Sequence, residues 1–216
     1  MKIFLDTAEV DQIESAYETG LIDGVTTNPT LIRKSGRDPV QVIKEIATKF
    51  PKLESISAEV VSDTLSGMIE QAQEFENFDN VTIKVPCTVE GLKACKQLSE
   101  HNIDVNVTLV FSVSQAILAA KAGAKYVSPF VGRWFDQGMD GIELIRNIRS
   151  VYNQDCNYKT NILSASIRDI TQLEKCAMYG TDVVTIPPIV FWAMYKNVLT
   201  EKGLEQFQKD WDIANR

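Results

Sequence analysis

Short apolar runs alternate with amphipathic stretches along the whole chain. The runs are four to six residues long and rich in β-branched side chains, which is typical of buried strands. Strands are predicted at residues 3–6, 24–27, 55–60, 81–85, 104–108, 125–128, 160–163 and 182–186. Each run is followed by a stretch with helical spacing of its apolar residues, so the pattern predicts eight strand–helix units.

The predicted helices carry recognisable start signals. Asp38 followed by Pro39 indicates an N-cap with proline in the first turn, and Thr88 is a second candidate cap. Ser112 with Gln115 has the spacing of a capping box. Helices are predicted at residues 8–19, 39–50, 65–75, 89–100, 112–122, 138–152 and 169–178, with a loop from 129 to 137 and at least one helix after 188.

Eight strand–helix units predict an α/β protein. Such units place parallel strands side by side through helical crossovers, and eight of them close a (β/α)8 TIM barrel. We therefore predict one barrel domain over residues 1–216, shorter than the usual length of about 250 residues. An open doubly wound sheet is the alternative, but no G-x-G-x-x-G motif follows the first predicted strand.

Composition excludes several classes of protein. The net charge of −7 and the absence of a basic run argue against nucleic-acid binding. The longest apolar run, residues 189–194, is too short to cross a membrane, and Asp6 comes too early for the apolar part of a signal peptide. The four cysteines, at positions 87, 95, 156 and 176, form no C-x-x-C motif and have no companion histidines. We expect small core residues, no metal and a reduced, cytoplasmic protein.

Lys84 occupies an unusual place in the middle of the fourth predicted strand. Lysine is rarely buried, because removing water from the ammonium group is costly. Burial favours the neutral amine, which is the nucleophile that forms a Schiff base with a carbonyl compound. The alternative is a lysine on an edge strand with its side chain in water.

Polar residues end nearly every predicted strand, and active sites of (β/α)8 barrels lie at these ends. The candidates are Asp6, Asn28, Glu59, Lys84, Asn106, Thr108, Ser128, Ser166 and Arg168. Strand alternation places Thr82 and Lys84 on one face, opposite the apolar residues at 81, 83 and 85, so we expect the polar face to line the barrel interior.

Six of these candidates also have a structural explanation. The explanations are helix capping for Asp6, a turn before proline for Asn28, a polar strand end for Asn106 and Thr108, and a structural ion pair for Glu59 and Lys84. A site is favoured because these residues occur together, at successive strand ends.

Four motifs resemble those of the transaldolase family: Asp6-Thr7, residues 24–30 (GVTTNPT), residues 83–86 (IKVP) and residues 131–133 (VGR). The chain is similar in particular to the short-chain branch, which also contains fructose-6-phosphate aldolase, and the similarity covers essentially the whole chain. The resemblance implies a class I aldolase barrel in which Lys84 forms the Schiff base. It implies neither a metal nor another cofactor.

The resemblance also implies catalytic roles for three further residues. Asp6 would be the general base that takes the proton of the C4 hydroxyl as the C3–C4 bond breaks. Glu59 would move protons through a water held by Thr108 during carbinolamine and imine formation.

Sugar-phosphate binding is implied for the remaining candidates. Hydroxyl groups of the three-carbon unit would be held by Asn28, Asn106 and Ser128, and the phosphate by Arg133 and Arg168 with help from Ser166. Trp134 and Phe135, beside Arg133, would either narrow the range of acceptors or pack against a neighbour.

The two activities of the branch differ at three positions. Strict aldolases tend to have glutamine, tyrosine and lysine where this chain has Glu59, Phe130 and Arg168, and Asn106 also matches the transaldolase side. This favours transfer of dihydroxyacetone from sedoheptulose 7-phosphate to glyceraldehyde 3-phosphate, giving erythrose 4-phosphate and fructose 6-phosphate. The alternatives are a fructose-6-phosphate aldolase that releases dihydroxyacetone, and a non-catalytic barrel that binds sugar phosphates.

The last predicted helix, about residues 201–213, has Leu204, Phe207 and Trp211 at helical spacing. It is either a core helix of its own chain or, as the resemblance implies, a helix that docks on a neighbouring subunit. Similar short-chain proteins form rings of five that often pair to ten. We therefore expect a homo-oligomer, a pentamer or decamer.

Overall fold

Parallel strands close into a barrel in the computed structural model, which describes residues 1–154 and 158–215. Neighbouring strands follow one another in chain order, and β1 pairs with β8. The strands are β1 Lys2–Asp6, β2 Gly24–Thr26, β3 Ser55–Glu59, β4 Val81–Pro86, β5 Val105–Val110, β6 Tyr126–Pro129, β7 Asn161–Ser164 and β8 Val183–Ile186. The (β/α)8 prediction is confirmed, and each predicted strand boundary is within two residues of the observed one.

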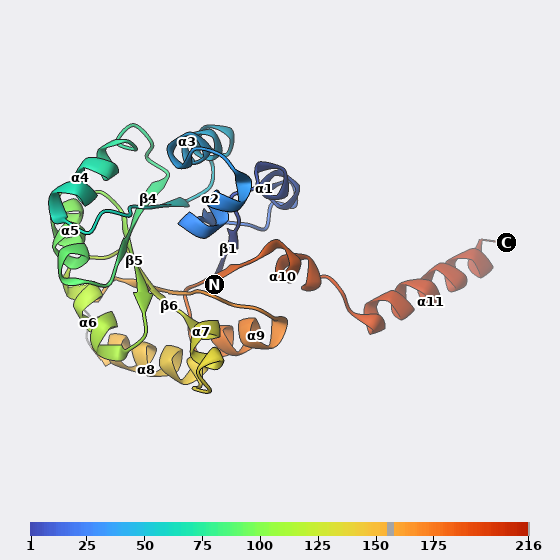
Figure 1. Ribbon diagram of the computed structural model, residues 1–216. Coiled ribbons are helices and arrows are strands. Elements are labelled where there is room, and N and C mark those ends of the chain that lie inside the picture. The colour runs from blue at the N-terminus through green and yellow to red at the C-terminus, as the bar shows by residue number, and fades with distance from the viewer. Residues whose placement is uncertain (155–157, 216) are drawn as a thin grey trace.

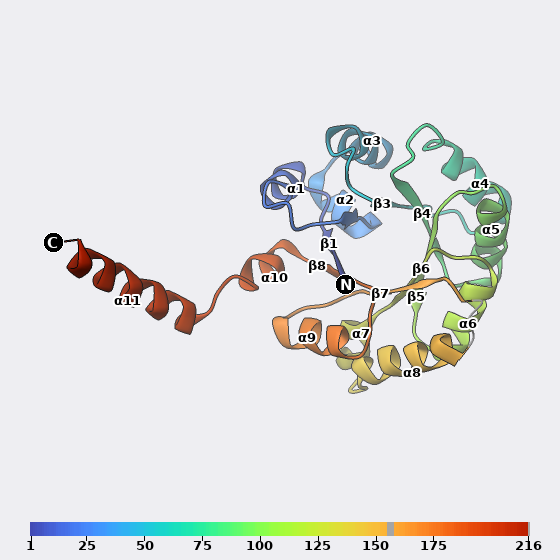
Figure 2. The ribbon, with the colours of Figure 1, turned by 180° about the vertical axis from the view of Figure 1, so that it is seen from behind.

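Helices surround the barrel (Figures 1 and 2). The helices of the described residues are α1 Val10–Tyr17, α2 Pro29–Ser35, α3 Pro39–Lys49, α4 Leu65–Gln73, α5 Val89–Glu100, α6 Val113–Lys121, α7 Val131–Asp136, α8 Gly141–Gln154, α9 Ile170–Met178, α10 Pro188–Ala193 and α11 Val198–Ala214. The predicted caps are confirmed, because side-chain oxygens of Asp38, Thr88 and Ser112 accept backbone N–H groups of α3, α5 and α6. In the described residues, no helix has the length and apolar character needed to cross a bilayer.

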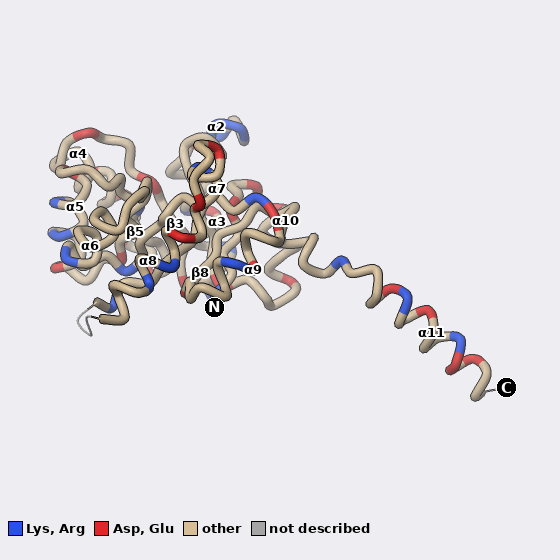
Figure 3. Tube along the Cα trace, turned by 90° about the horizontal axis from the view of Figure 1, so that it is seen from below, with Lys and Arg blue, Asp and Glu red and all other residues tan. Residues whose placement is uncertain are grey.

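Two short helices at the barrel mouth were not predicted. The expected loop over residues 129–137 is wrong, since Val131–Asp136 form α7, and α2 follows β2 directly. Six or seven residues are too few to show a helical period. Both helices lie at the end of the barrel opposite to the N-terminus, above the carboxyl ends of the strands (Figure 3).

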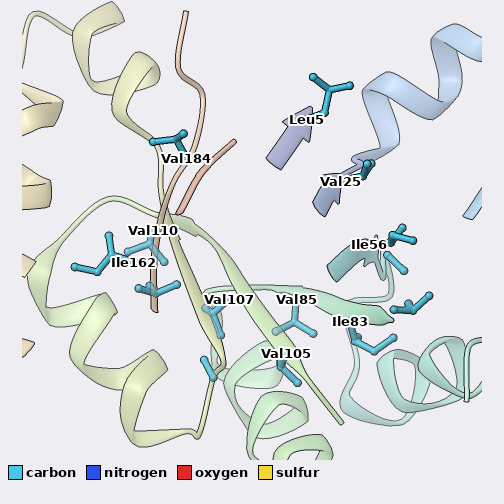
Figure 4. Packing of buried hydrophobic residues seen from close by; sticks show 14 of the residues in the cluster. Leu5, Val25, Ile56, Ile83, Val85, Val105, Val107, Val110, Ile162 and Val184 are labelled. Atoms are coloured by element: carbon cyan, nitrogen blue, oxygen red, sulfur yellow. The ribbon is translucent and has the colours of Figure 1, made fainter. Parts of the chain in front are cut away.

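Strand alternation separates two sets of buried residues. Outward-facing side chains such as Leu5, Ile56, Ile83 and Val85 belong to the main hydrophobic core between strands and helices (Figure 4). Cys95 and Cys176 are buried in this core as predicted, Cys87 packs against it while partly buried, and Cys156 is outside the described residues. The opposite face of each strand is therefore left to fill the barrel interior.

The lower part of the interior is packed with side chains. Phe4 and Tyr126 meet edge to face, with ring centroids 5.7 Å apart, in a small cluster with Leu163, Ala165 and Val183. Gly24 makes room for this cluster, because a Cβ there would lie 2.7 Å from the Phe4 ring. The interior is thus filled at its amino-terminal end, and any site is confined to the carboxyl-terminal end.

A hydrogen bond links this cluster to a charged group. Tyr126 Oη donates to Glu54 Oε1 over 2.9 Å, and Lys2 forms an ion pair with the same carboxylate. Burial alone would raise the pKa of Glu54, but the hydrogen bonds from Lys2 and Tyr126 outweigh it and hold that pKa below its ordinary value. The folded state therefore favours the Glu54 carboxylate.

Helix α11 lies away from the barrel (Figure 1). None of its residues is buried, and Leu204, Phe207 and Trp211 are each more than 60% exposed. The alternative of a core helix within its own chain is therefore wrong.

We predict that Tyr126→Phe lowers the free energy of unfolding by about 1 kcal/mol at pH 7, because Glu54 loses a charge-stabilising donor. A group with a lowered pKa stabilises the fold above its unfolded value and loses that effect as the pH falls through the folded one. The loss should therefore shrink below about pH 4. Urea unfolding at pH 7 and pH 3 measures this.

Tyr152→Phe is the matched control, since Tyr152 Oη donates to the uncharged carbonyl of Ala116. Its effect should not depend on pH in this range. Equal pH dependence for the two variants would contradict the role of Glu54.

Candidate active site

A cavity of about 450 Å³ opens at the carboxyl ends of the strands. Nine of the eleven predicted site residues line it: Asp6, Asn28, Glu59, Lys84, Asn106, Ser128, Phe130, Arg133 and Ser166. Thr108 and Arg168 do not line it. The residues that strand alternation turned inward thus meet at one end of the barrel.

Lys84 is buried inside the barrel, only 6% exposed. Its Nζ lies 2.9 Å from Glu59 Oε2 as an ion pair, and it donates a hydrogen bond to the Thr27 carbonyl oxygen over 3.3 Å. The pair follows from strand register, because Glu59 on β3 lies directly beside Lys84 on β4. The alternative of a lysine on an exposed edge strand is wrong.

Asp6 contributes a second carboxylate from β1. Thr26 Oγ1 donates to Asp6 Oδ1 over 2.8 Å. Burial raises the pKa of Asp6; the charge of Lys84 and the Thr26 hydrogen bond oppose this, while Glu59 adds to it, and the net shift is upward. Helix α1 begins only at Val10, so Asp6 does not cap it and that structural explanation is wrong. A raised pKa suits a carboxylate that exchanges protons.

Amide and hydroxyl groups line the wall beyond Lys84. Ser128 Oγ donates to Asn106 Oδ1 over 2.7 Å. Within the described part of the chain, Asn106 Nδ2 and Thr108 Oγ1 are buried without a hydrogen-bond partner. Buried polar atoms are normally paired, so Asn106, which lines the cavity, is suited to hold a polar ligand there. Asn28 lines the cavity and also caps α2, since its Oδ1 accepts the Leu31 N–H over 3.0 Å.

The predicted phosphate ligands are divided between two places. Arg133 lines the cavity with its guanidinium 4.9 Å from the centre of the Phe130 ring, and Ser166 lines it in a left-handed conformation with φ of 61°. Arg168 instead forms a two-pronged ion pair with Asp136, in which Nη1 lies 2.6 Å from Oδ1. The structure therefore brings one predicted arginine to the cavity and holds the other beside it.

Gly132 allows this arrangement of α7 against the loop after β7. A Cβ at Gly132 would lie 2.1 Å from the Ser166 carbonyl oxygen. Trp134, on the same helix, is partly buried and packs against the main core, whereas Phe135 is exposed. Trp134 therefore packs within its own chain, while Phe135 lies at the surface.

Several lining residues were missed by the sequence reasoning. Thr185 lies between Val184 and Ile186, and Thr26 follows Val25 in the second predicted strand, so strand parity could have identified both. Leu109 could not be found this way, because it enters the cavity at a register shift between Val107 and Val110 with its φ at 58°.

A buried lysine–carboxylate pair with a second carboxylate, at the mouth of a (β/α)8 barrel, is the arrangement of an enzyme site. The model of the family described as Transaldolase/Fructose-6-phosphate aldolase matches residues 3–216. This chain belongs to that family.

Curated relatives agree with the match. A probable transaldolase of Caulobacter vibrioides is 52% identical over 212 residues, covering 98% of this chain and 96% of that protein. One of Erythrobacter litoralis is 52% identical over 219 residues, covering 100% and 99%. One of Nitrosopumilus maritimus is 50% identical over 213 residues, covering 98% and 95%.

We predict that Asp6→Asn raises the melting temperature at pH 7 by a few degrees, because the isosteric amide removes a partly buried charge. A carboxyl group with a raised pKa contributes stability that is present at low pH and lost as the pH rises through the folded pKa. The gain should therefore vanish below about pH 4, where Asp6 is protonated in both states. Calorimetry at the two pH values measures it.

Asp104→Asn is the control, since Asp104 forms an ion pair with Lys125 near the surface. It should not raise the melting temperature at pH 7. A lower melting temperature for Asp6→Asn at pH 7 would contradict the unfavourable burial of the Asp6 charge.

Proposed function

We propose that this protein is a transaldolase that transfers a dihydroxyacetone unit between sugar phosphates through a Schiff base on Lys84. The observation that carries the proposal is the buried Lys84–Glu59 pair, with Asp6 in the same cavity. An ion pair of this kind rarely repays its desolvation cost, which favours a chemical role over a structural one.

The first stage uses the lysine and its partner. A proton moves from Lys84 Nζ to Glu59, and the neutral amine attacks C2 of the ketose phosphate. The C2 oxygen takes up protons and leaves as water, so that an iminium ion links C2 to Nζ. Glu59 is the group placed to exchange these protons, and Thr108 would hold the water that carries them.

The second stage breaks the carbon–carbon bond. Asp6 takes the proton of the C4 hydroxyl, the C4–O bond becomes a carbonyl, and the electrons of the C3–C4 bond move into the iminium ion. The aldose phosphate leaves, and a three-carbon enamine stays on Lys84. An acceptor such as glyceraldehyde 3-phosphate then reverses these steps, with Asp6 returning the proton to the new C4 oxygen.

The lining of the same cavity supports the proposed substrate-binding roles. Asn28, Asn106 and Ser128 would hold the hydroxyls of the three-carbon unit. Arg133 and Ser166 would bind the phosphate, and Arg168 would join them by leaving Asp136 or by using a free edge of its guanidinium.

Phe130 favours transfer over release. Free dihydroxyacetone forms only when the enamine is protonated and hydrolysed, and a phenyl ring offers no hydroxyl to hold a water for this step. The printed names of the relatives, probable transaldolase, support the same choice. A fructose-6-phosphate aldolase of the same family remains the second candidate.

Two measurements test the proposal. Borohydride reduction with fructose 6-phosphate should add a three-carbon unit to Lys84, detected by peptide mass, and Lys84→Met should lack both adduct and turnover. Dihydroxyacetone release from fructose 6-phosphate should be slow, while formation of glyceraldehyde 3-phosphate should rise when erythrose 4-phosphate is added as the acceptor, with sedoheptulose 7-phosphate as the second product. Phe130→Tyr should increase the release.

The outcomes separate the candidates. Rapid release by the unaltered protein without an acceptor would identify an aldolase instead. No adduct at Lys84 would leave only a sugar-phosphate-binding barrel.

We also propose that α11 docks on a neighbouring subunit of a homo-oligomer. Its exposed Phe207 and Trp211 would be covered by that contact. Phe207→Glu with Trp211→Glu should therefore lower the assembly mass measured by light scattering. Gln206→Glu, on a charged face, is the control. A monomeric unaltered protein, or an unchanged mass in the double variant, would contradict the proposal.

A further inference from the structure

Three side chains from three adjoining strands form a hydrogen-bonded chain at the cavity wall. Asp6 is on β1, which pairs with β2 on one side and β8 on the other. Thr26 Oγ1 on β2 lies 2.8 Å from Asp6 Oδ1 and 2.5 Å from Thr185 Oγ1 on β8. Both threonines line the cavity, although they are only 3% and 4% exposed. Neither has a role in the reaction described above.

The direction of these hydrogen bonds follows from the charge of Asp6. A threonine hydroxyl has a single hydrogen, so Thr26 cannot donate to both neighbours. A carboxylate only accepts, and therefore Thr26 donates to Asp6 while Thr185 donates to Thr26. The second bond polarises the first and strengthens it. The two hydroxyls thus act together on Asp6 Oδ1.

Asp6 Oδ2 is the oxygen left for the substrate. Among the described residues it has no hydrogen-bond partner, whereas Oδ1 is occupied by Thr26. The charged groups that face Asp6 are Lys84 and Glu59, from β4 and β3. The two strands that pair with β1 are β2 and β8, and they contribute the uncharged hydroxyls of Thr26 and Thr185.

We propose that Thr26, polarised by Thr185, is a positioning residue for Asp6. It holds Oδ1 so that Oδ2 faces the C4 hydroxyl, and it stabilises the ionised form that accepts the proton. This inference rests on the proposed function. It gives Thr26 and Thr185 a role in the step that breaks the C3–C4 bond and no role in the formation of the Schiff base.

The proton balance of that step is simple. The C4 hydroxyl proton moves to Oδ2 as the C3–C4 bond breaks, and Asp6 becomes a neutral carboxylic acid. The Thr26 bond to Oδ1 is then weaker, because hydrogen bonds to a charged acceptor are the stronger kind. The hydrogen bonds from Thr185 to Thr26 and from Thr26 to Asp6 therefore favour loss of this proton from Asp6. The proton returns to the oxygen that becomes the C4 hydroxyl when the enamine adds to an acceptor aldehyde.

The test is the pH profile of kcat/KM for ketose phosphate cleavage, measured by coupled detection of the aldose phosphate. Thr26→Val should lower kcat/KM at neutral pH by roughly 10- to 100-fold. The acidic limb of the pH profile of kcat/KM should move to higher pH in this variant, since Asp6 ionises less readily without the hydrogen bond from the Thr26 hydroxyl. Thr185→Val should shift the limb in the same direction by less, and Thr26→Ser should restore both rate and profile.

Thr82→Val is the matched control. Thr82 is also buried in the barrel interior, and its hydroxyl pairs with Ser55 Oγ over 2.7 Å instead of with Asp6. This variant should leave the acidic limb in place. An unmoved limb in Thr26→Val, or an equal shift in Thr82→Val, would mean that the threonines only join the strands, and would overturn the inference.

A second readout separates this inference from the proposed function. Dihydroxyacetone has no C4, so its reductive trapping on Lys84 by borohydride does not need Asp6 as a base. Thr26→Val should trap it at the rate of the unaltered protein, and a similarly slowed rate for trapping and cleavage would contradict the assignment. Failure of the unaltered protein to form any adduct would instead refute the Schiff-base function itself.

Discussion

The burial of the Lys84 ammonium group is the constraint on which the rest of the site depends. A closed barrel has no strand edge through which a side chain on its inner face could reach water sideways. Lys84 must therefore find its partners inside, and it finds them in Glu59 and the Thr27 carbonyl. Removing one member of a buried pair typically costs about 3–5 kcal/mol, so lysine and glutamate are required together.

The same constraint divides the interior into two zones. Near the amino-terminal ends of the strands, Phe4 and Tyr126 pack edge to face and fill the space. Near the carboxyl-terminal ends the inward positions are polar, and most of them pair across neighbouring strands, as Ser128 does with Asn106. Side chains fill the amino-terminal end of the barrel, and polar side chains pair with one another at the carboxyl-terminal end. The reactive groups are therefore confined to one cavity, where their mutual positions follow from strand register.

Register explains how much could be predicted from the sequence. An alternation of period two turns Thr82 and Lys84 inward together, so a correct strand assignment was enough to locate Lys84 and Glu59. The mouth of the barrel obeys no such period. Leu109 reaches the cavity through a register shift, and α7 is too short to carry a helical pattern.

The pairing of Arg168 with Asp136 could not be predicted from the sequence, for another reason. Its pairing with Asp136 joins residues 32 positions apart, and depends on how closely Gly132 lets α7 approach Ser166. Because Arg168 follows the seventh strand, the sequence could place it near the mouth of the barrel. Whether its side chain enters the cavity or pairs with Asp136 is decided by side-chain contacts.

Two carboxylates in one cavity could in principle exchange roles, and their surroundings decide against this. Glu59 lies directly against the amine, so in the proposed reaction it exchanges protons with the nitrogen and with the departing water. Asp6 is held by a hydrogen bond from Thr26, and burial keeps the pKa of Asp6 raised. A raised pKa suits a carboxylate that takes one proton from a hydroxyl group and returns it. Different environments give the two carboxylates different tasks, a pattern by which one site combines acid and base chemistry. The nearest partners of the two carboxylates also differ, because Asp6 accepts a hydrogen bond from the neutral hydroxyl of Thr26 whereas Glu59 lies against the ammonium group of Lys84.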